Sequence, residues 1–332
     1  MFTKDIGIDL GTANVLIYVK GQGIVLNEPS VVAIDNDTKK TLAVGIEAKE
    51  MLGRTPGDIV AIKPMKDGVI ADFEITETML NYFIKKINGN NPFIRQRILV
   101  CCPSNITQVE KNAIRDAAEK TGAKKVYIEE EPKVAAIGAG LDISKANGCM
   151  VVDIGGGTTD IAILSLGGIV KSSSLKIAGN TFDYEISKYI KDKFKLLIGE
   201  RTAENIKLTI GSVFSNKKNE EMEIKGRHMI TGLPKTITIT SNDVIDALSE
   251  CVDLIIQNVK LILEQTPPEL SSDIYENGIV LTGGGSLVDG LDKALEKEIQ
   301  VPVYLANNPL TCVCEGTGIM LENLNLLDKL HQ

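Results

Sequence analysis

Residues 150–160 read MVVDIGGGTTD, and residues 5–14 read DIGIDLGTAN. In each stretch an apolar run leads through an aspartate, Asp153 or Asp9, into a turn rich in glycine and threonine. A second apolar run, a glycine turn and a third apolar run complete both patterns. This duplication predicts two related α/β lobes that face each other, each beginning with a hairpin of strands.

Length and composition agree with two lobes. The 332 residues exceed one ordinary core and suit two lobes of roughly 150 residues each. The net charge of −8 and the pI of about 5.1 argue against a nucleic-acid partner, which would need a basic stripe. We find no Gly/Ser linker, so short ordered crossings should join the lobes.

Hydrophobic periodicity predicts the other elements. Thr107 and Glu110 form a capping-box pattern at the start of one helix. Strands are expected at 97–102, 125–129 and 279–282, and helices at 75–87, 107–121, 133–140, 182–197, 241–264 and 287–295.

The cysteines and the N-terminus predict a cytoplasmic protein. None of the six cysteines forms a CxxC pair, and only two histidines could add imidazole, so we expect buried free thiols and no metal site there. The first residues enter a strand without signal-peptide architecture, and no apolar run approaches the ~20 residues that span a bilayer. Contact with a membrane surface remains compatible with this sequence.

The two glycine turns are the main candidates for chemistry. We call residues 11–14 the first glycine turn and residues 155–158 the second. A turn without bulky side chains lets consecutive backbone N–H groups point at one anion, so both turns could grip the β- and γ-phosphates of one nucleotide. Asp9 and Asp153 would then sit beside the phosphates and hold Mg²⁺ through its waters. Either turn alone would be an ordinary hairpin.

Two further segments are weaker candidates. Pro132 is expected to hold Glu131 extended at a strand-to-helix junction, where its carboxylate could orient an attacking water. The alternative is an acidic helix N-terminus that the helix dipole stabilises. The TGGGS run at 282–286 either lets the backbone approach an adenine ring or is a simple tight turn.

These motifs together resemble the MreB-type bacterial actins, within the superfamily of actin, the heat-shock chaperones and the sugar kinases. The resemblance spans essentially the whole chain, and KPMKDGVIAD is specific to MreB-type proteins; the chain resembles a divergent member. The matching runs are DLGTAN (9–14), GRTPG (53–57), KPMKDGVIADFE (63–74), EEP with AAIGAGL (130–141), MVVDIGGGTTDIAILSLGGIV (150–170), IGERTAENIK (198–207) and TGGGS (282–286).

The resemblance implies an actin-like ATPase fold: two duplicated ribonuclease-H-like lobes with a nucleotide cleft between them, each carrying a smaller inserted subdomain. Subdomain IA would comprise 1–32, 63–144 and 315–332, IB 33–62, IIA 145–180 and 246–314, and IIB 181–245. The implied ATP-binding residues are Thr12, Ala13, Asn14, Gly155, Gly156, Gly157, Glu204, Asn205, Ile206, Lys207, Gly283, Gly284, Gly285 and Ser286. Glu131 would position the hydrolytic water, and Thr158 would lie near the γ-phosphate.

Two departures from the family pattern predict slow hydrolysis. Family members usually carry Glu where this chain has Asp160, and an apolar residue where it has Lys133. A cation two residues from Glu131 could pair with it and pull it from the water.

A loop offers a membrane contact. Phe93 and Ile94 would lie at a loop tip among several cations, which suits shallow insertion into an anionic leaflet, as in the family; alternatively the pair packs into the core. The protein would then be peripheral at the inner face of the cell membrane.

The resemblance implies double antiparallel filaments of identical copies that control cell shape, or motility in wall-less cells, with other MreB copies or cell-shape proteins as further partners. Two alternatives stay open. One is a polymerising scaffold with negligible hydrolysis, and the other is a small-molecule kinase of the same fold.

Overall fold

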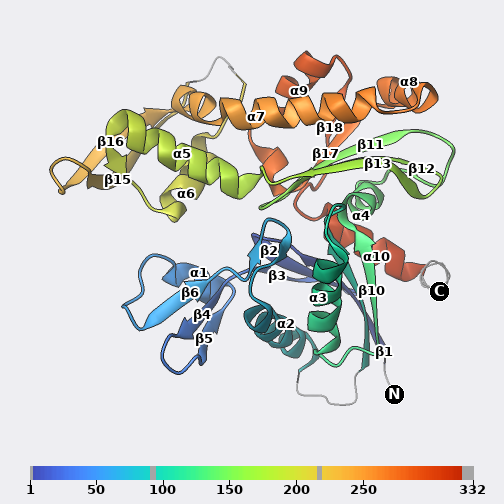
Figure 1. The fold of residues 1–332 in the computed structure, drawn as a ribbon, viewed down its shortest axis with the longest axis horizontal. Coiled ribbons are helices and arrows are strands. Elements are labelled where there is room, and N and C mark those ends of the chain that lie inside the picture. Colours follow the sequence, from blue (N-terminus) through green and yellow to red (C-terminus); the bar gives the residue numbers. More distant parts are fainter. Residues whose placement is uncertain (1–2, 90–94, 215–218, 324–332) are drawn as a thin grey trace.

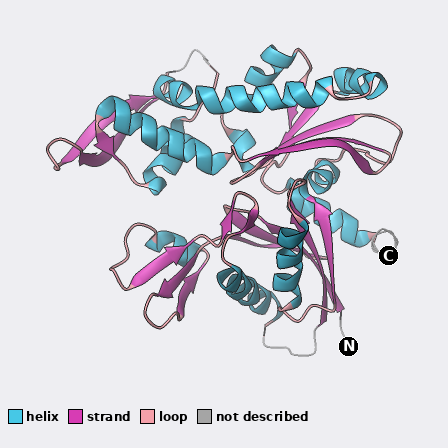
Figure 2. Cartoon of the chain, in the orientation of Figure 1, coloured by secondary structure: helices cyan, strands magenta, loops and turns pink. Residues whose placement is uncertain are grey.

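The chain folds into two lobes, lobe I below and lobe II above in Figure 1. The computed structural model describes residues 3–89, 95–214 and 219–323. Both lobes combine a large sheet, a small sheet and covering helices (Figure 2).

The large sheet of lobe I has the order β10-β9-β1-β2-β3. β1 runs antiparallel to β2 and parallel to β9. Alternate residues of β9 face opposite sides: Ile98 packs in the core with α2 and α3, whereas Leu99 packs in the core with α4 and α10. The elements are β1 (Thr3–Leu10), β2 (Asn14–Val19), β3 (Gly23–Pro29), α2 (Phe73–Asn88), β9 (Arg95–Cys102), α3 (Gln108–Glu119), β10 (Lys125–Glu130), α4 (Glu131–Gly138) and α10 (Cys312–Glu322).

The large sheet of lobe II repeats this plan in the order β13-β12-β11-β17-β18. β11 runs antiparallel to β12 and parallel to β17, just as β1 runs antiparallel to β2 and parallel to β9. The actin-like duplication is therefore present. The elements are β11 (Cys149–Ile154), β12 (Thr159–Ser165), β13 (Gly168–Leu175), α5 (Gly179–Phe194), α7 (Ser241–Glu264), α8 (Pro268–Asn277), β17 (Ile279–Thr282), α9 (Leu291–Ile299) and β18 (Val303–Leu305).

Each lobe also carries a small three-stranded sheet at the end farther from α4 and α10 (Figure 1). In lobe I, α1 (Ile46–Met51) accompanies β4 (Val32–Asp35), β5 (Thr41–Val44) and β6 (Ile59–Ile62). In lobe II, α6 (Glu200–Ile210) accompanies β14 (Leu196–Leu197), β15 (Glu221–His228) and β16 (Pro234–Thr240). A two-stranded ribbon, β7 (Met65–Lys66) and β8 (Val69–Ile70), follows β6. The boundaries of the four subdomains stay predictions.

Local sequence rules succeeded for some helices and failed for others. The Thr107–Glu110 capping box forms, and α7 spans the predicted 241–264. The helix expected at 182–197 ends at Phe194, because Lys195 turns left-handed (φ 55°) and the next two residues form β14. The helix expected at 287–295 begins only at Leu291, after a 3-10 turn (Gly284–Leu287) and Gly290 at φ 78°.

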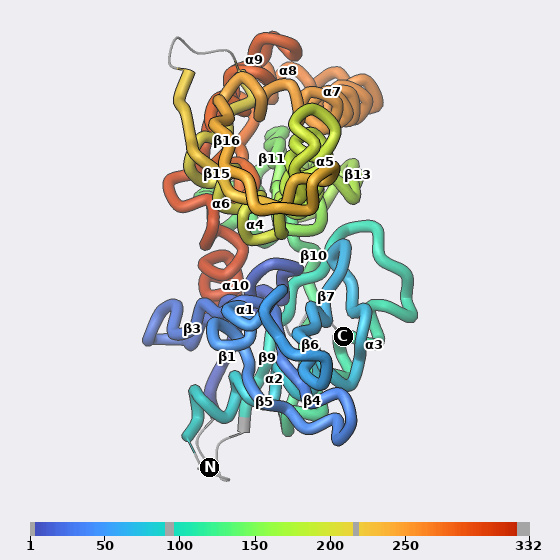
Figure 3. Tube along the Cα trace, turned by 90° about the vertical axis from the view of Figure 1, so that its left-hand side faces the viewer, coloured from blue at the N-terminus to red at the C-terminus, as the bar shows by residue number. Residues whose placement is uncertain are grey.

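Two glycines let α4 and α10 cross where the lobes join. A Cβ on Gly138 would overlap the carbonyl oxygen of Cys312, and one on Gly316 would overlap that of Val134. The two backbones therefore touch, which ties lobe II to the sheet of lobe I at one place (Figure 3).

Replacing Gly316 by valine is expected to lower the free energy of unfolding by about 1–3 kcal/mol or more, because the added side chain must push the two helices apart. Urea denaturation measures the change. Gly57→Ala is the matched control, since a Cβ there would meet nothing within 4 Å. Equal unfolding midpoints for both variants would contradict the close crossing.

Candidate functional site

The two glycine turns meet between the lobes. Each connects a pair of antiparallel strands, β1 with β2 and β11 with β12. A Cβ on Gly156 would lie 2.6 Å from the Cβ of Ala13, and one on Gly157 would overlap the Thr12 side chain. Sequence-distant glycine turns therefore face each other, as the duplication predicted, with backbone on both sides.

Four carboxyl groups converge beside these turns. Asp9 is the second-to-last residue of β1, and Asp153 is the second-to-last residue of β11. Burial raises the pKa of Asp153 to about 8, and the charges of Asp160 and Asp9 add to the effect. Burial also raises the pKa of Asp9 to about 7. The charges of neighbouring acids therefore add to the effect of burial at Asp153.

Glu131 belongs to the same cluster. Burial raises its pKa well above the ordinary range, and Asp153, Asp160 and Asp9 raise it further. Contrary to the sequence-based expectation, Glu131 is the first residue of α4, and Glu130 is the extended residue before it (φ −77°, ψ 128°). Pro132 fits this first turn because its missing N–H would have no helical partner there.

The expected pairing of Lys133 with Glu131 was wrong. Lys133 Nζ lies 3.0 Å from Glu129 Oε2, so Lys133 forms an ion pair with the glutamate four residues before it in the sequence. Both residues line a groove of about 520 Å³ whose walls come from α3, β10, α4 and β13. Residues two apart in an extended-to-helical segment point apart, which leaves Glu131 free of this cation.

Polar contacts fix the ends of both glycine turns. Thr12 Oγ1 accepts a hydrogen bond from the backbone N–H of Gly68 at 3.0 Å. A Cβ on Gly68 would lie 3.0 Å from Thr158 Cγ2, so Gly68 contacts both turns. Asp160 Oδ1 accepts from the backbone N–H of Ser104 at 3.2 Å, which holds Asp160 against lobe I.

The third glycine run packs directly on the second glycine turn. Gly283 has a φ of 79°, and a Cβ there would overlap the Asp153 side chain and the Ile154 carbonyl. A Cβ on Gly285 would lie 2.5 Å from Ile154 Cγ2. Ser286 Oγ donates to the Gly283 carbonyl at 2.6 Å. The run thus extends the glycine-lined surface along lobe II.

Helix α6 brings a lysine to this surface. Lys207 Nζ pairs with Asp183 Oδ1 at 2.8 Å and donates to the Gly179 carbonyl at 2.8 Å. A Cβ on Gly179 would lie 3.4 Å from that nitrogen and 3.7 Å from the Cα of Gly156, so Lys207 ends beside the second glycine turn.

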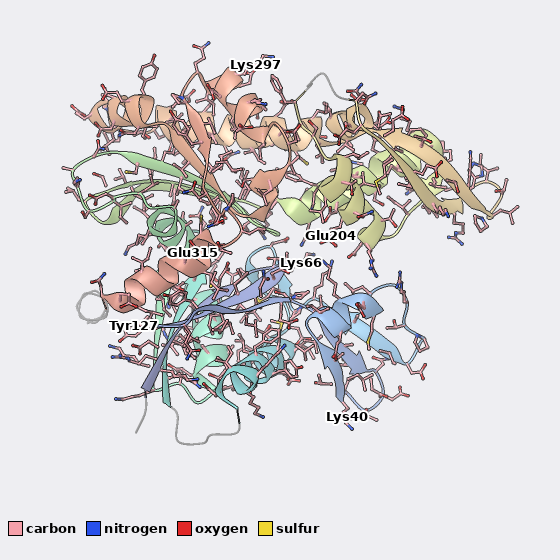
Figure 4. The ribbon with its side chains drawn as sticks, turned by 180° about the vertical axis from the view of Figure 1, so that it is seen from behind. Lys40, Lys66, Tyr127, Glu204, Lys297 and Glu315 are labelled. Carbon is pink, nitrogen blue, oxygen red and sulfur yellow. The ribbon has the colours of Figure 1, made fainter. Side chains whose placement is uncertain are left out.

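The other members of the 204–207 run differ in their surroundings. Glu204 is partly buried and points toward lobe I (Figure 4), and Asn205 is exposed. The side chain of Ile206 is fully buried in the core of lobe II, and its assignment to the nucleoside edge stays a prediction. Helical periodicity explains this split, since one face of α6, with Ala203, Ile206 and Ile210, packs into the core and the opposite face points outward.

Comparison with known proteins adds an independent finding. The MreB/Mbl protein family matches residues 3–329. The chain belongs to the MreB/Mbl family. This MreB/Mbl chain is 63% identical to the cell shape-determining protein Mbl of Bacillus cereus, covering 99% of both sequences. It is 54% identical to the cell shape-determining protein MreB of Escherichia coli, covering 98% of this chain and 95% of the relative.

Solved structures agree with the fold. MreB 5 of Spiroplasma citri bound to AMPPNP superimposes with a TM-score of 0.95 at 42% identity and 100% coverage of both chains. MreB5 of the same organism bound to ADP gives a TM-score of 0.93 at 43% identity, covering 97% of this chain and 98% of the other. The expected actin-like fold is confirmed.

The acids of this MreB/Mbl protein suit a magnesium ion held through water. Within residues 3–89, 95–214 and 219–323, no group of three or more His, Cys, Asp or Glu could hold a metal directly. Asp153 Oδ2 is buried without a hydrogen-bond partner, which leaves an acceptor for a metal-bound water. Asp9 and Asp153 would hold the ion, which when bound neutralises phosphate charge.

The sequence alone missed several contributors. Gly68, Ser104 and Asp183 contact the turns or their supporting side chains, and none stood out by itself. Gly68 lies within KPMKDGVIAD, so the family-specific motif was the available signal. Ser104 and Asp183 act through tertiary contacts that no local pattern reveals.

The raised pKa values predict how stability depends on pH. Asp153 titrates near 3.8 when unfolded but near 8 in the nucleotide-free fold, so the folded chain keeps its proton longer. Between these values stability falls as the pH rises, because the unfolded state binds fewer protons. We expect the unfolding temperature of the nucleotide-free protein to drop from pH 6 to pH 8, and Asp153→Asn to flatten that drop. Identical slopes for both proteins would contradict the buried acid cluster.

Other predictions about this chain have different outcomes. The six cysteines are all buried and free, as expected. Among the helices of the described part, none is long and apolar enough to cross a membrane. Phe93 and Ile94, the predicted membrane contacts, lie outside the described residues.

Proposed function

We propose that this protein binds ATP with Mg²⁺ between its lobes and polymerises into filaments on the inner face of the cell membrane. The observation that carries the proposal is the meeting of two duplicated glycine turns beside converging acids. Backbone N–H groups from both lobes can surround one triphosphate, so a bound nucleotide would hold the lobes together. The AMPPNP and ADP complexes of the Spiroplasma citri relatives support a nucleotide in this place.

Hydrolysis is proposed to be slow. Glu131 must be ionised to accept a proton from water, but burial and the neighbouring acids raise its pKa and so favour the neutral carboxyl in the nucleotide-free fold. Mg²⁺ near Asp9 and Asp153 would lower that pKa by offsetting their charges. The residue would thus be active only when metal and nucleotide are in place. The raised pKa of Glu131, and not an ion pair with Lys133, is thus the proposed reason for a low hydrolysis rate. A polymerising scaffold with negligible hydrolysis is the extreme of the same behaviour.

Lobe II has complementary ends that suit head-to-tail assembly. The β15–β16 hairpin tip exposes Met229, Ile230 and Leu233, whose exposed fractions are 45%, 79% and 65%. Arg227 and Lys235 flank this tip and are exposed. Helix α8, at the opposite end of the lobe in Figure 1, carries three acids, no lysine or arginine, and Tyr275 exposed at 66%. A contact between two different surfaces generates an open filament when its rotation does not close into a ring.

Replacing Ile230 by glutamate is expected to raise the critical concentration for assembly by about tenfold or more. The variant loses one apolar contact residue and places a negative charge against the acidic surface of α8. Nucleotide affinity should stay within about twofold, because the hairpin tip is remote from the glycine turns (Figure 1). Pelleting with ATP measures the first quantity and nucleotide titration the second. Thr231→Glu, beside it, controls for added charge alone. Full assembly of the Ile230 variant would exclude this end.

The proposed role is control of cell shape. The Bacillus cereus and Escherichia coli relatives are described as cell shape-determining. The 63% identity to the Bacillus cereus Mbl, over 99% of both sequences, supports this role. Membrane attachment through Phe93 and Ile94, a cytoplasmic location and further cell-shape partners belong to the same proposal.

Electron microscopy tests the function most simply. The purified protein should form filaments with ATP and Mg²⁺, fewer with ADP and few without nucleotide, and filaments should coat anionic liposomes. Particles that remain single under all these conditions would overturn the filament. Phosphate transfer from ATP to a small acceptor, with no polymer, would instead support the kinase alternative.

A further inference from the structure

Two ion pairs join the small parts of the lobes. Lys49 Nζ, on α1 of lobe I, lies 2.8 Å from Glu204 Oε1 on α6 of lobe II. Lys63 Nζ, just after β6 of lobe I, lies 2.6 Å from Glu200 Oε2 on the same helix. Figures 1 and 3 show α1 and α6 facing each other across the gap between the lobes.

The two ion pairs lie opposite the crossing of α4 and α10, which we call the hinge. The crossing of α4 and α10 joins the lobes on one side of the β1–β2 hairpin, and α1 and α6 meet on the other side (Figure 1). The glycine turns therefore lie between a covalent connection and an ionic one. The ion pairs therefore join the lobes on the side of the glycine turns that lies opposite the hinge.

The geometry of α6 makes the two pairs act together. Glu200 and Glu204 are four residues apart, so both carboxylates project from one face of the helix toward lobe I. Lys49 and Lys63 come from a helix and from the end of a strand, which are ordered supports. The two pairs hold one helix at two points one turn apart, and separation of the lobes breaks both.

The same helix reaches the nucleotide site. Lys207 follows Glu204 by three residues and ends beside the second glycine turn. A movement of α6 away from lobe I therefore moves Lys207 relative to the turn. Glu204 is also one of the residues that the family resemblance assigns to the nucleoside edge, and its ion pair with Lys49 fixes the direction of its carboxylate.

We propose that Lys49–Glu204 and Lys63–Glu200 form a clasp that keeps the lobes closed and slows release of bound nucleotide, with Lys49 positioning Glu204 from the opposite lobe. This inference rests on the proposed binding of ATP between the lobes. The side chains of the clasp are partly exposed, with exposed fractions from 33% to 77%, so salt screens them. Partly exposed pairs are individually weak, so removal of both should accelerate release about three- to tenfold.

The test measures release of a fluorescent ATP analogue with Mg²⁺ from the full chain by stopped flow, below the concentration that assembles. Lys63→Glu and Glu200→Lys should each speed release, and the double charge swap should restore the wild-type rate. Lys49→Met should speed release, whereas Lys49→Arg, which keeps the positive charge, should release the analogue at close to the wild-type rate. High salt should speed release from the wild type and change the Lys49→Met, Lys63→Met double variant little.

Lys40→Met is the matched control, since Lys40 lies on the same small part of lobe I but far from Glu204 (Figure 4). Unfolding temperatures of the nucleotide-free variants separate loss of the clasp from loss of folding. Unchanged release rates in every clasp variant, or a swap that fails to restore the rate, would overturn the clasp. A wild type that does not bind the analogue would overturn the proposed function instead.

Discussion

Replacing Glu131 by glutamine is expected to lower the rate of ATP hydrolysis by about 100-fold or more while nucleotide binding persists. Glutamine keeps the shape of the side chain but cannot accept a proton from water. The nucleotide-free variant should be as stable as the wild type or slightly more stable, because burial raises the pKa of Glu131 and favours its neutral form, which glutamine mimics.

Glu130→Gln provides the matched control for this variant. Glu130 is the neighbouring residue at the end of β10 and lines the groove that also holds Lys133, so its charge should affect hydrolysis by less than about threefold, as expected of a solvent-screened charge. Phosphate release from pelleted polymer measures the rate, and titration with AMPPNP measures binding. Equal loss in both variants would mean that Glu131 acts only through the general acidity of this segment.

Replacing Gly156 by valine is expected to weaken nucleotide binding by about 100-fold or more. This is the scale of loss when polar groups of a buried site can no longer reach their partners. A single Cβ at Gly156 would already lie 2.6 Å from the Cβ of Ala13, and a valine side chain is larger. The added atoms would fill the space where phosphate oxygens must approach the backbone N–H groups. Polymer assembly with ATP should fail as a consequence.

Gly168→Ala controls for the loss of a glycine in the same sheet. It lies at the next turn of the β11–β12–β13 meander, and a Cβ there would come only within 3.9 Å of the Ser165 carbonyl. Isothermal titration with Mg·AMPPNP should give wild-type affinity for this control. Normal affinity of the Gly156 variant would place the phosphates elsewhere.

Features fixed by neighbouring residues were predictable from the sequence. The paired hairpins followed from apolar runs broken by glycine, and α7 followed from its amphipathic period. The acid cluster followed from the duplication, since equivalent positions in facing lobes bring Asp9 and Asp153 together.

Features fixed by tertiary contact were not predictable. The partner of Lys133 depended on where α4 begins. Because α4 begins at Glu131, Lys133 pairs with Glu129 and not with Glu131 as expected. The core position of Ile206 required the rotation of α6, which the short run ENIK does not define. The clasp joins residues more than a hundred positions apart and leaves no trace in local pattern.

A crystal structure with AMPPNP and Mn²⁺, which reports its position by anomalous scattering, tests the central claim most directly. We predict a manganese peak between Asp9 and Asp153 and a triphosphate contacted by backbone N–H groups of residues 11–14 and 155–158. A fully occupied nucleotide bound to one lobe only, or a manganese peak away from both aspartates, would contradict it.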